Sequence, residues 1–218
     1  MLVPGGWQGG WVFDEVGAKL RSEGHEVEAV TLAGLEQDRQ ADDCPNLDTH
    51  IDQVAELVEH HGGGPLALCG HSYAGLVIAG VADRLGDRLD HLVFIDAYVP
   101  ADGDSCWSLT SDAFRQMFID GVRGDGRWVA VPDGLDPRAR PHPMPSFVQP
   151  IKLTGSSPAV QRTYISGGPW PGTPFADLTE RLRADPAWQV HEIPVGHNIA
   201  RRDPSSLAAV LAALTPRS

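Results

Sequence analysis

The sequence lacks the features of a secreted, membrane-spanning or metal-binding protein. Its 218 residues include only three cysteines, Cys44, Cys69 and Cys106, which cannot all pair within one chain and whose spacing fits no metal framework. Its first residues contain no basic stretch followed by an apolar one, and no apolar run approaches the roughly 18 residues that span a bilayer. We therefore expect a cytoplasmic protein with reduced thiols, no metal and no membrane association.

Positive charge is also scarce. Lys and Arg number 17 against 29 Asp and Glu, which gives a formal net charge of -12. Such a chain repels polyphosphates, and Arg201-Arg202 is too small a cluster to reverse this locally. Nucleic-acid binding is therefore not expected. The hydrophobic fraction of 42% and the length fit one globular domain over residues 1–218.

Short apolar runs alternate with helical periodicity along most of the chain. The predicted strands are Leu2-Val3, Val27–Thr31, Leu66–Cys69, Leu92–Ile95, Arg162–Ile165 and Gln189–Ile193. The predicted helices are Trp11–Glu23, Leu47–His60, Tyr73–Leu85, Phe175–Ala184 and Pro204–Leu214. This order predicts an α/β fold, with a mostly parallel central sheet of about six strands flanked by helices on both faces.

One stretch interrupts the alternation. From about Pro100 to Lys152 the sequence is rich in proline and glycine, and only Ser111–Ile119 has helical periodicity. Because this stretch lies between two sheet strands, we interpret about 100–158 as a lid inserted after the strand that ends near Asp96. Loops at that edge of a parallel sheet lie where ligands bind.

The clearest chemical signal is the run 66–78, in which an apolar strand turns sharply into an apolar helix with Ser72 at the turn. Such a nucleophile elbow exposes the serine hydroxyl above the sheet edge. The turn needs small residues, and Gly70 and Ala74 supply them, with the expected second glycine delayed to Gly75. The alternative is an ordinary turn in which Ser72 caps a helix.

A serine nucleophile needs a base and an acid. His197 follows the last predicted strand and is the best candidate base, whereas His71 is a weaker one. In hydrolases with this elbow the acid lies between serine and histidine in the chain. Asp96 ends a strand beside the elbow strand and is favoured as the acid. Asp177, inside a helix, is the alternative.

Two backbone amides are the predicted donors to an oxyanion, which is usually stabilised by such groups. One is the N–H of Tyr73, directly after the nucleophile, and the other is the N–H of Gly6, in the glycine-rich loop after the first strand. That loop lacks the lysine of a phosphate-binding loop and the glycine spacing of a dinucleotide site.

Several motifs together resemble the small α/β-hydrolases grouped with plant methylesterases and hydroxynitrile lyases, and especially their bacterial esterase-like relatives. The matching stretches are 2–11, 24–27, 31–35, 70–75, 94–100, 141–147 and 196–198. The resemblance covers nearly the whole chain and implies the α/β-hydrolase fold, Ser72 and His197 as the catalytic pair, amides of Gly6 and Tyr73 as oxyanion donors, and no cofactor. Two departures stand out: Pro4 replaces a usual histidine, and no lysine matches the one that lyases use for cyanide.

We therefore expect a cofactor-independent serine hydrolase that cleaves an ester, lactone or similar acyl bond. Its expected partner is a small apolar or aromatic acyl substrate, with a homodimer left open. The predicted substrate pocket, whose aromatic residues could equally form the core of the lid, comprises Trp7, Trp107, Phe114, Phe118 and Trp128. Two alternatives remain: non-hydrolytic chemistry in the same site, as in a cyclase, dehydratase or lyase, and a receptor-like binding protein.

Overall fold

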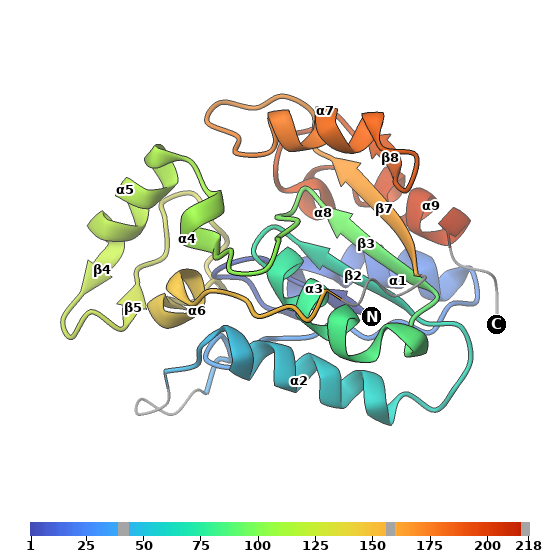
Figure 1. Cartoon of the computed structure of the whole chain (residues 1–218), viewed down its shortest axis with the longest axis horizontal. Coiled ribbons are helices and arrows are strands. Elements are labelled where there is room, and N and C mark those ends of the chain that lie inside the picture. The colour runs from blue at the N-terminus through green and yellow to red at the C-terminus, as the bar shows by residue number, and fades with distance from the viewer. Residues whose placement is uncertain (39–43, 156–159, 215–218) are drawn as a thin grey trace.

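A computed structural model describes residues 1–38, 44–155 and 160–214 (Figure 1). Its central sheet has five parallel strands in the order β1-β2-β3-β7-β8. These strands are β1 (Leu2–Val3), β2 (Ala67–His71), β3 (His91–Ile95), β7 (Gln161–Ser166) and β8 (Gln189–Glu192). Because all five run the same way, their carboxyl ends meet at one edge, and the loops that follow them converge there.

Alternating side chains give the sheet two hydrophobic faces. In β3, Leu92 and Phe94 join one buried cluster, whereas Val93 and Ile95 join the other. The first cluster is covered by α2 (Leu47–His60), α3 (Ala74–Leu85) and α7 (Ala176–Ala184). The short helix η2 (Gly86–Arg88) follows α3 directly. The second is covered by η1 (Gly10–Phe13), α1 (Asp14–Ser22), α8 (Ile199–Arg202) and α9 (Pro204–Leu214). This confirms the prediction of a sheet flanked by helices on both faces.

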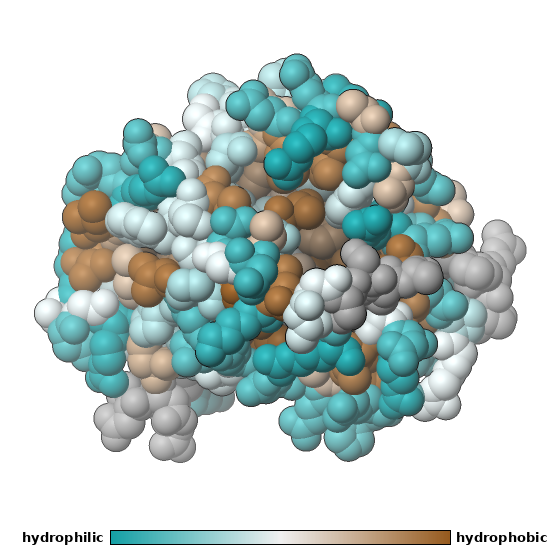
Figure 2. All heavy atoms as spheres, viewed as in Figure 1, coloured by the Kyte–Doolittle hydropathy of each residue, from teal (hydrophilic) through white to brown (hydrophobic). Residues whose placement is uncertain are grey.

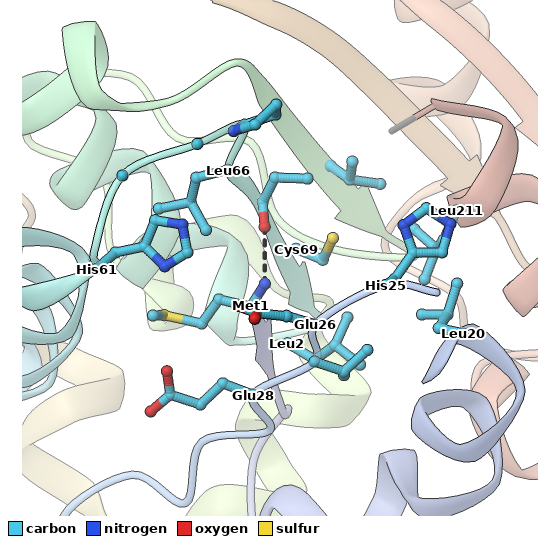
Figure 3. Close-up of a pocket in the computed structure, with 16 residues that line it drawn as sticks. Met1, Leu2, Leu20, His25, Glu26, Glu28, His61, Leu66, Cys69 and Leu211 are labelled. Atoms are coloured by element: carbon cyan, nitrogen blue, oxygen red, sulfur yellow. Dashed lines mark hydrogen bonds between the residues drawn. The ribbon is translucent and has the colours of Figure 1, made fainter. Parts of the chain in front are cut away.

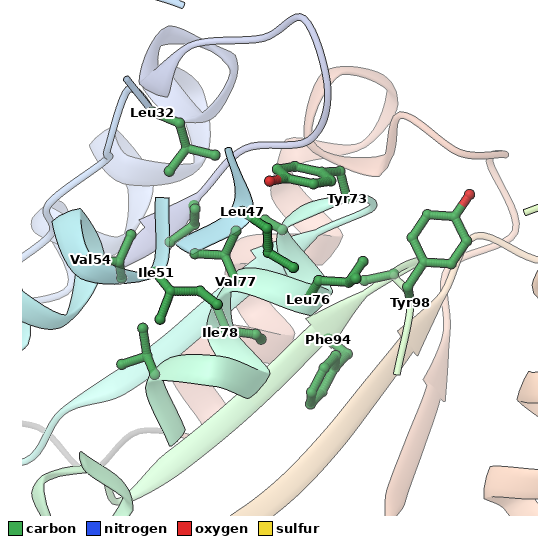
Figure 4. Packing of buried hydrophobic residues seen from close by; sticks show 14 of the residues in the cluster. Leu32, Leu47, Ile51, Val54, Tyr73, Leu76, Val77, Ile78, Phe94 and Tyr98 are labelled. Carbon is green, nitrogen blue, oxygen red and sulfur yellow. The ribbon is translucent and has the colours of Figure 1, made fainter. Parts of the chain in front are cut away.

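Helix α2 packs closely against α3, as Figure 4 shows for the side chains between them. Its first turn is fixed by a capping box, in which the Asn46 side chain accepts from the Thr49 amide. Farther along, Ile51 lies so near α3 that a Cβ added at Gly80 would be 2.5 Å from its Cδ1. Helix α2 thereby holds α3, which begins beside Ser72, against the sheet.

The sheet has five strands, and the strand predicted at residues 27–31 was wrong, because this segment forms no strand. Only an isolated bridge joins Ala29 to Leu2. The neighbouring strand, β1, has just two residues, so residues 27–31 have too few backbone partners for a ladder of strand hydrogen bonds. The segment nevertheless runs beside β1, where Leu2 donates to the Glu28 carbonyl and Val30 donates to that of Leu2.

Between β3 and β7 the chain leaves the sheet and forms a separate set of short elements, on the left in Figure 1. They are α4 (Cys106–Leu109), α5 (Asp112–Gly121), β4 (Val122–Arg123), β5 (Trp128–Val129), β6 (His142–Pro143) and α6 (Met144–Val148). Strands β4, β5 and β6 pair antiparallel. We call residues 100–155 the lid segment. The prediction of a single helical patch there was incomplete, and the last predicted lid residues, 156–158, lie outside the described part.

The surface is mostly hydrophilic on the face that Figure 2 presents, with hydrophobic side chains emerging chiefly over the lid segment and near the middle. Ile119 on α5, 53% exposed, and Val148 on α6, 42% exposed, are the large hydrophobic residues that are exposed in the described chain. Each described helix is too short or too polar to cross a bilayer.

Candidate active site

The turn between β2 and α3 carries Ser72 in a left-handed backbone conformation, with φ 55°. Two glycines make this turn sterically feasible. A Cβ at Gly70 would be 2.8 Å from the Ala74 carbonyl oxygen, and one at Gly75 would be 2.0 Å from that of Tyr98. The glycine at position 75 therefore has its own steric role, which is to let α3 approach the loop after β3. The first turn of α3 lies directly behind the serine and favours negative charge there.

His197 joins Ser72 to Asp96 in one hydrogen-bonded chain. Its Nε2 lies 3.0 Å from Ser72 Oγ, and its Nδ1 lies 2.8 Å from Asp96 Oδ2. An ionised carboxylate can only accept, so the proton sits on Nδ1. The lone pair of Nε2 then faces the serine hydroxyl, which is the arrangement that a general base requires.

Asp96 is held by more than the imidazole. It is 1% exposed, and its backbone φ is 41°. The Gly167 amide donates to Oδ1 at 2.9 Å, and the Trp170 indole N–H donates to Oδ2 at 3.0 Å. Trp170 also packs beside the His197 ring, with centroids 5.0 Å apart. Reasoning from the sequence missed this function of Trp170, because the contact joins residues that lie 74 positions apart.

Asp177, the alternative acid, lies elsewhere. It is exposed in the first turn of α7, where an acidic side chain favours the helix N-terminus. The carboxylate at the carboxyl end of β3 is the one that the structure places in contact with His197.

The glycine-rich loop after β1 lies against the elbow. A Cβ at Gly5 would be 2.9 Å from Ser72 Cβ, so only glycine lets the backbone pass this close. The next residues carry the loop into the site, and Trp7 has φ 63°. Within the described residues, the backbone N–H groups of Gly6 and Tyr73 donate to no protein acceptor. Both amides are therefore available to a ligand oxygen.

His71, the weaker candidate base, has another role in the site. It is buried, and burial, together with the nearby His197, lowers its pKa to about 3. Its Nε2–H donates to the His197 carbonyl oxygen at 2.9 Å. The neutral ring thus holds the loop that carries His197, at 4.7 Å between the two ring centroids.

A cavity of about 150 Å³ opens beside Ser72 and His197. Its hydrophobic wall comes mainly from the glycine-rich loop and the lid segment, and comprises Trp7, Phe114, Met117, Pro132 and Leu135. Gln8, Asp133 and Asn198 add polar groups. Among His, Cys, Asp and Glu, no group of three or more in the described residues is arranged to hold a metal ion.

Of the five predicted pocket residues, Trp7 and Phe114 line this cavity, whereas Trp107, Phe118 and Trp128 do not. Phe118 is 2% exposed and stacks on Phe147 with ring centroids 4.5 Å apart. Trp107 packs beside Phe118 at 6.5 Å. The prediction was wrong for these residues: Phe118 and Trp107 pack into the buried cluster that continues from one face of the sheet into the lid segment, and Trp128 lies against Gly34, where an added Cβ would be 3.1 Å from its Cη2.

A larger cavity, of about 400 Å³, lies at the opposite end of the sheet, where β1 and β2 begin (Figure 3). Leu2, Leu66, Cys69 and Leu211 form its apolar side, and the Met1 amino group beside it donates to the Ala67 carbonyl oxygen at 2.8 Å. Since Ser72 and Asp96 follow the carboxyl ends of β2 and β3, this cavity is separate from the site.

Comparison with known proteins agrees with this fold. A family model described as "Alpha/beta hydrolase family" matches residues 1–217. The carbendazim hydrolyzing esterase of Nocardioides sp. (strain SG-4G) is 34% identical over 237 aligned residues, which cover 98% of each protein. Methylesterase 1 of Arabidopsis thaliana is 29% identical over 103 residues, or 46% of this chain and 39% of that protein. The structure of an extracellular alpha/beta-hydrolase from Paenibacillus species superposes with a TM-score of 0.81 at 19% identity, covering 98% of this chain and 97% of that one.

Proposed function

The chain belongs to the alpha/beta hydrolase family, and we propose that it is a carboxylic ester hydrolase that works through an acyl-enzyme on Ser72. The observation that carries this proposal is the hydrogen-bonded chain Ser72–His197–Asp96, with distances of 3.0 and 2.8 Å. The esterase that shares 34% identity over nearly its whole length supports the reaction class.

In the proposed reaction, His197 Nε2 accepts the proton of Ser72 as its Oγ attacks the substrate carbonyl carbon. The amides of Gly6 and Tyr73 donate to the oxyanion that forms. The tetrahedral intermediate then expels the alcohol, which takes the proton from His197. A water molecule, deprotonated by His197, then attacks the acyl-enzyme and forms a second tetrahedral intermediate. When this intermediate collapses, His197 returns the proton to Ser72 Oγ, and the carboxylic acid is released.

The cavity suggests the substrate class. Its volume of about 150 Å³ and its wall of Trp7, Phe114, Met117 and Leu135 favour a small apolar or aromatic substrate. We therefore propose short-chain aromatic esters, and carbendazim, the compound named for the Nocardioides relative, as the first substrates to assay.

Two cysteine thiols indicate the cellular compartment in which the protein works. Cys69 and Cys106 are buried and form no disulfide within the described residues. Burial raises the pKa of Cys69 to about 11 and that of Cys106 to about 12, so both thiols stay protonated and inert. Such thiols suit a reducing compartment, and we propose the cytoplasm.

The test of the proposed function is covalent capture of Ser72. The wild-type protein should release p-nitrophenol from p-nitrophenyl acetate in a burst of about one equivalent, as an acyl-enzyme accumulates. A fluorophosphonate should label Ser72, located by peptide mass spectrometry, and abolish turnover. Ser72→Ala should lower kcat by at least about 10⁴-fold, because the nucleophile is gone.

Ser22→Ala, on the exposed face of α1, is the matched control and should keep wild-type kcat. Labelling of a different serine would contradict the assignment of Ser72. Turnover that survives Ser72→Ala would instead favour non-hydrolytic chemistry in the same cavity.

A further inference from the structure

The lid segment makes a direct contact with the loop that carries Gly6. His142, in β6, is completely buried, and its Nδ1 accepts from the backbone N–H of Trp7 at 3.1 Å. Trp7 follows Gly6 directly, so this bond fixes the peptide next to a proposed oxyanion donor. The two partners lie 135 positions apart in the sequence.

The neighbouring Ser146 determines the tautomer of His142. Its hydroxyl donates to the Pro143 carbonyl oxygen at 2.8 Å, and a carbonyl can only accept. The Ser146 oxygen is therefore the acceptor in its 2.9 Å contact with His142 Nε2, which must carry the proton. Nδ1 keeps its lone pair for Trp7. Burial, with His50 nearby, holds the pKa of His142 well below its ordinary value, so the ring stays neutral.

The other polar groups of Trp7 are also held by the lid segment. Its carbonyl oxygen accepts from the Arg140 amide at 2.9 Å, and its indole N–H donates to the Val129 carbonyl oxygen at 3.2 Å. The His142 ring is itself clamped, because it stacks on Phe147 at 4.0 Å between centroids. These contacts hold Trp7 at φ 63°, a conformation that a bulky side chain rarely adopts unless its surroundings impose it.

We infer that His142 is a positioning residue for ester hydrolysis, which it serves by holding the Gly6 amide where the oxyanion forms. This inference rests on the proposed function. It assigns the lid segment a second task besides lining the cavity: residues 129–147 brace the oxyanion loop from outside the sheet. A lid that braces this loop cannot leave the site during turnover without releasing the Gly6 amide as well.

Two substitutions at this position separate the bond from the packing. His142→Phe keeps a flat ring against Phe147 but removes the acceptor for Trp7. His142→Asn loses the ring but places an amide oxygen near the position of Nδ1. The measurements are kcat and KM on p-nitrophenyl acetate, the inhibition constant of phenylboronic acid, and the thermal midpoint of unfolding. Phenylboronic acid is informative because its tetrahedral adduct on the serine places an oxygen between the two amides.

We expect His142→Phe to lower kcat about 100-fold, near the loss seen when one oxyanion donor is removed. KM should change by less than about threefold, and the inhibition constant of phenylboronic acid should rise in parallel with the loss of kcat. His142→Asn should recover at least about tenfold of the lost kcat, even where it unfolds at a lower temperature than His142→Phe. Leu211→Ala, which weakens the core under α9 on the other face of the sheet, should lower the thermal midpoint and leave kcat unchanged.

The inference is overturned if His142→Phe keeps wild-type kcat. It is also overturned if the kcat of both His142 variants falls only in proportion to their thermal midpoints, while the inhibition constant of phenylboronic acid is the same in the two variants. If His142→Phe does not fold, Ser146→Ala makes the same test, because it frees Nε2–H from its acceptor and allows the other tautomer. It should lower kcat about tenfold, and unchanged kcat overturns the inference. Failure of the proposed function can be distinguished from failure of this inference. If Ser72 is not the nucleophile, Ser72→Ala will remain active, whatever the kcat values of the His142 variants are.

Discussion

Three residues at the site share an uncommon backbone conformation. Among the described non-glycine residues, Trp7, Ser72 and Asp96 are the ones with positive φ. Each such residue costs about 1–3 kcal/mol and persists only where neighbours impose it. At Ser72 the Gly75 and Tyr98 amides hold the backbone carbonyl, at 3.0 and 3.2 Å. The nucleophile, the acid and the loop beside the oxyanion are therefore held by tertiary hydrogen bonds rather than by local preference.

The assignment of the acid can be tested with one pair of substitutions. Asp96→Asn should lower kcat by about 10⁴-fold, because an amide in place of Oδ2 favours the wrong tautomer of His197. Asp177→Asn, on an exposed turn of α7, should change kcat by less than twofold and the free energy of unfolding by less than about 0.5 kcal/mol. The measurement is kcat of both variants on one ester, with circular dichroism to establish that each is folded.

The Asp177 variant is the control for removal of a carboxylate as such. The triad is drawn wrongly if Asp177→Asn is the inactive variant and Asp96→Asn the active one. In Asp96→Asn the Gly167 amide can still donate to Oδ1 and hold the new side chain, whereas the Trp170 indole N–H, like His197 Nδ1, would face the new amide nitrogen instead of an acceptor.

At the scale of elements, the elbow depends on how closely α3 approaches the loop after β3. The Gly75→Ala methyl group would lie 2.0 Å from the Tyr98 carbonyl oxygen, which is backbone and cannot turn away. We expect α3 to shift, with a loss of about 3 kcal/mol or more in stability. For a chain of this size that corresponds to a thermal midpoint about 6–12 °C lower. Activity at 25 °C should fall as well, because the shift moves the Tyr73 amide.

Gly17→Ala is the matched control, since Gly17 also lies in a helix. There the new methyl group would lie 3.1 Å from the flexible end of Arg21 and 3.5 Å from Val27 Cγ1, which is an ordinary van der Waals distance. The substitution should be neutral or raise stability by up to about 1 kcal/mol through helix propensity. Equal thermal midpoints for the two variants, measured by calorimetry, would show that the short distance at Gly75 does not limit the packing of α3.

The elements that could be predicted from the sequence are those with a local signature. The helical periodicity of α2 predicted its bounds, Leu47–His60, and all five strands of the central sheet begin and end within two residues of their predicted limits. The lid segment could not be predicted in this way. Its strands have two residues each, too short for any alternation, and they are fixed by pairing with one another.

The same limit applies to the site. Ser72, His197 and Asp96 could be proposed because each follows a strand at the edge where parallel strands end. The contacts that hold them, Trp170 with Asp96 and His142 with Trp7, join segments 74 and 135 positions apart. Such pairs leave no periodic pattern in one sequence, so only the folded chain reveals them.

For the molecule as a whole, buried neutral histidines predict how stability depends on pH. Burial lowers the pKa of His50 to about 4 and that of His71 to about 3, and it holds the pKa of His142 well below its ordinary value. In the unfolded chain each of them titrates near 6.5. Below pH 6.5 the unfolded state therefore binds more protons than the native state, and stability falls as pH falls. Above about pH 7 the contribution of these groups is complete and constant.

We expect His50 and His71 each to cost roughly 2 kcal/mol of stability at pH 5 relative to pH 7.5, and His142 to act in the same direction. Urea unfolding between pH 7.5 and 4.5, at low protein concentration, measures the effect. His50→Gln should make the pH dependence shallower, because one of the buried neutral histidines is removed. It should also lower stability at pH 7.5, since His50 accepts from the Tyr73 hydroxyl at 2.8 Å and donates to the Ala33 carbonyl oxygen at 3.0 Å. His60→Gln, at the exposed end of the same helix, should keep the wild-type slope. A slope that is the same in His50→Gln, His60→Gln and the wild type would mean that carboxylates, and not buried histidines, govern the loss of stability in acid.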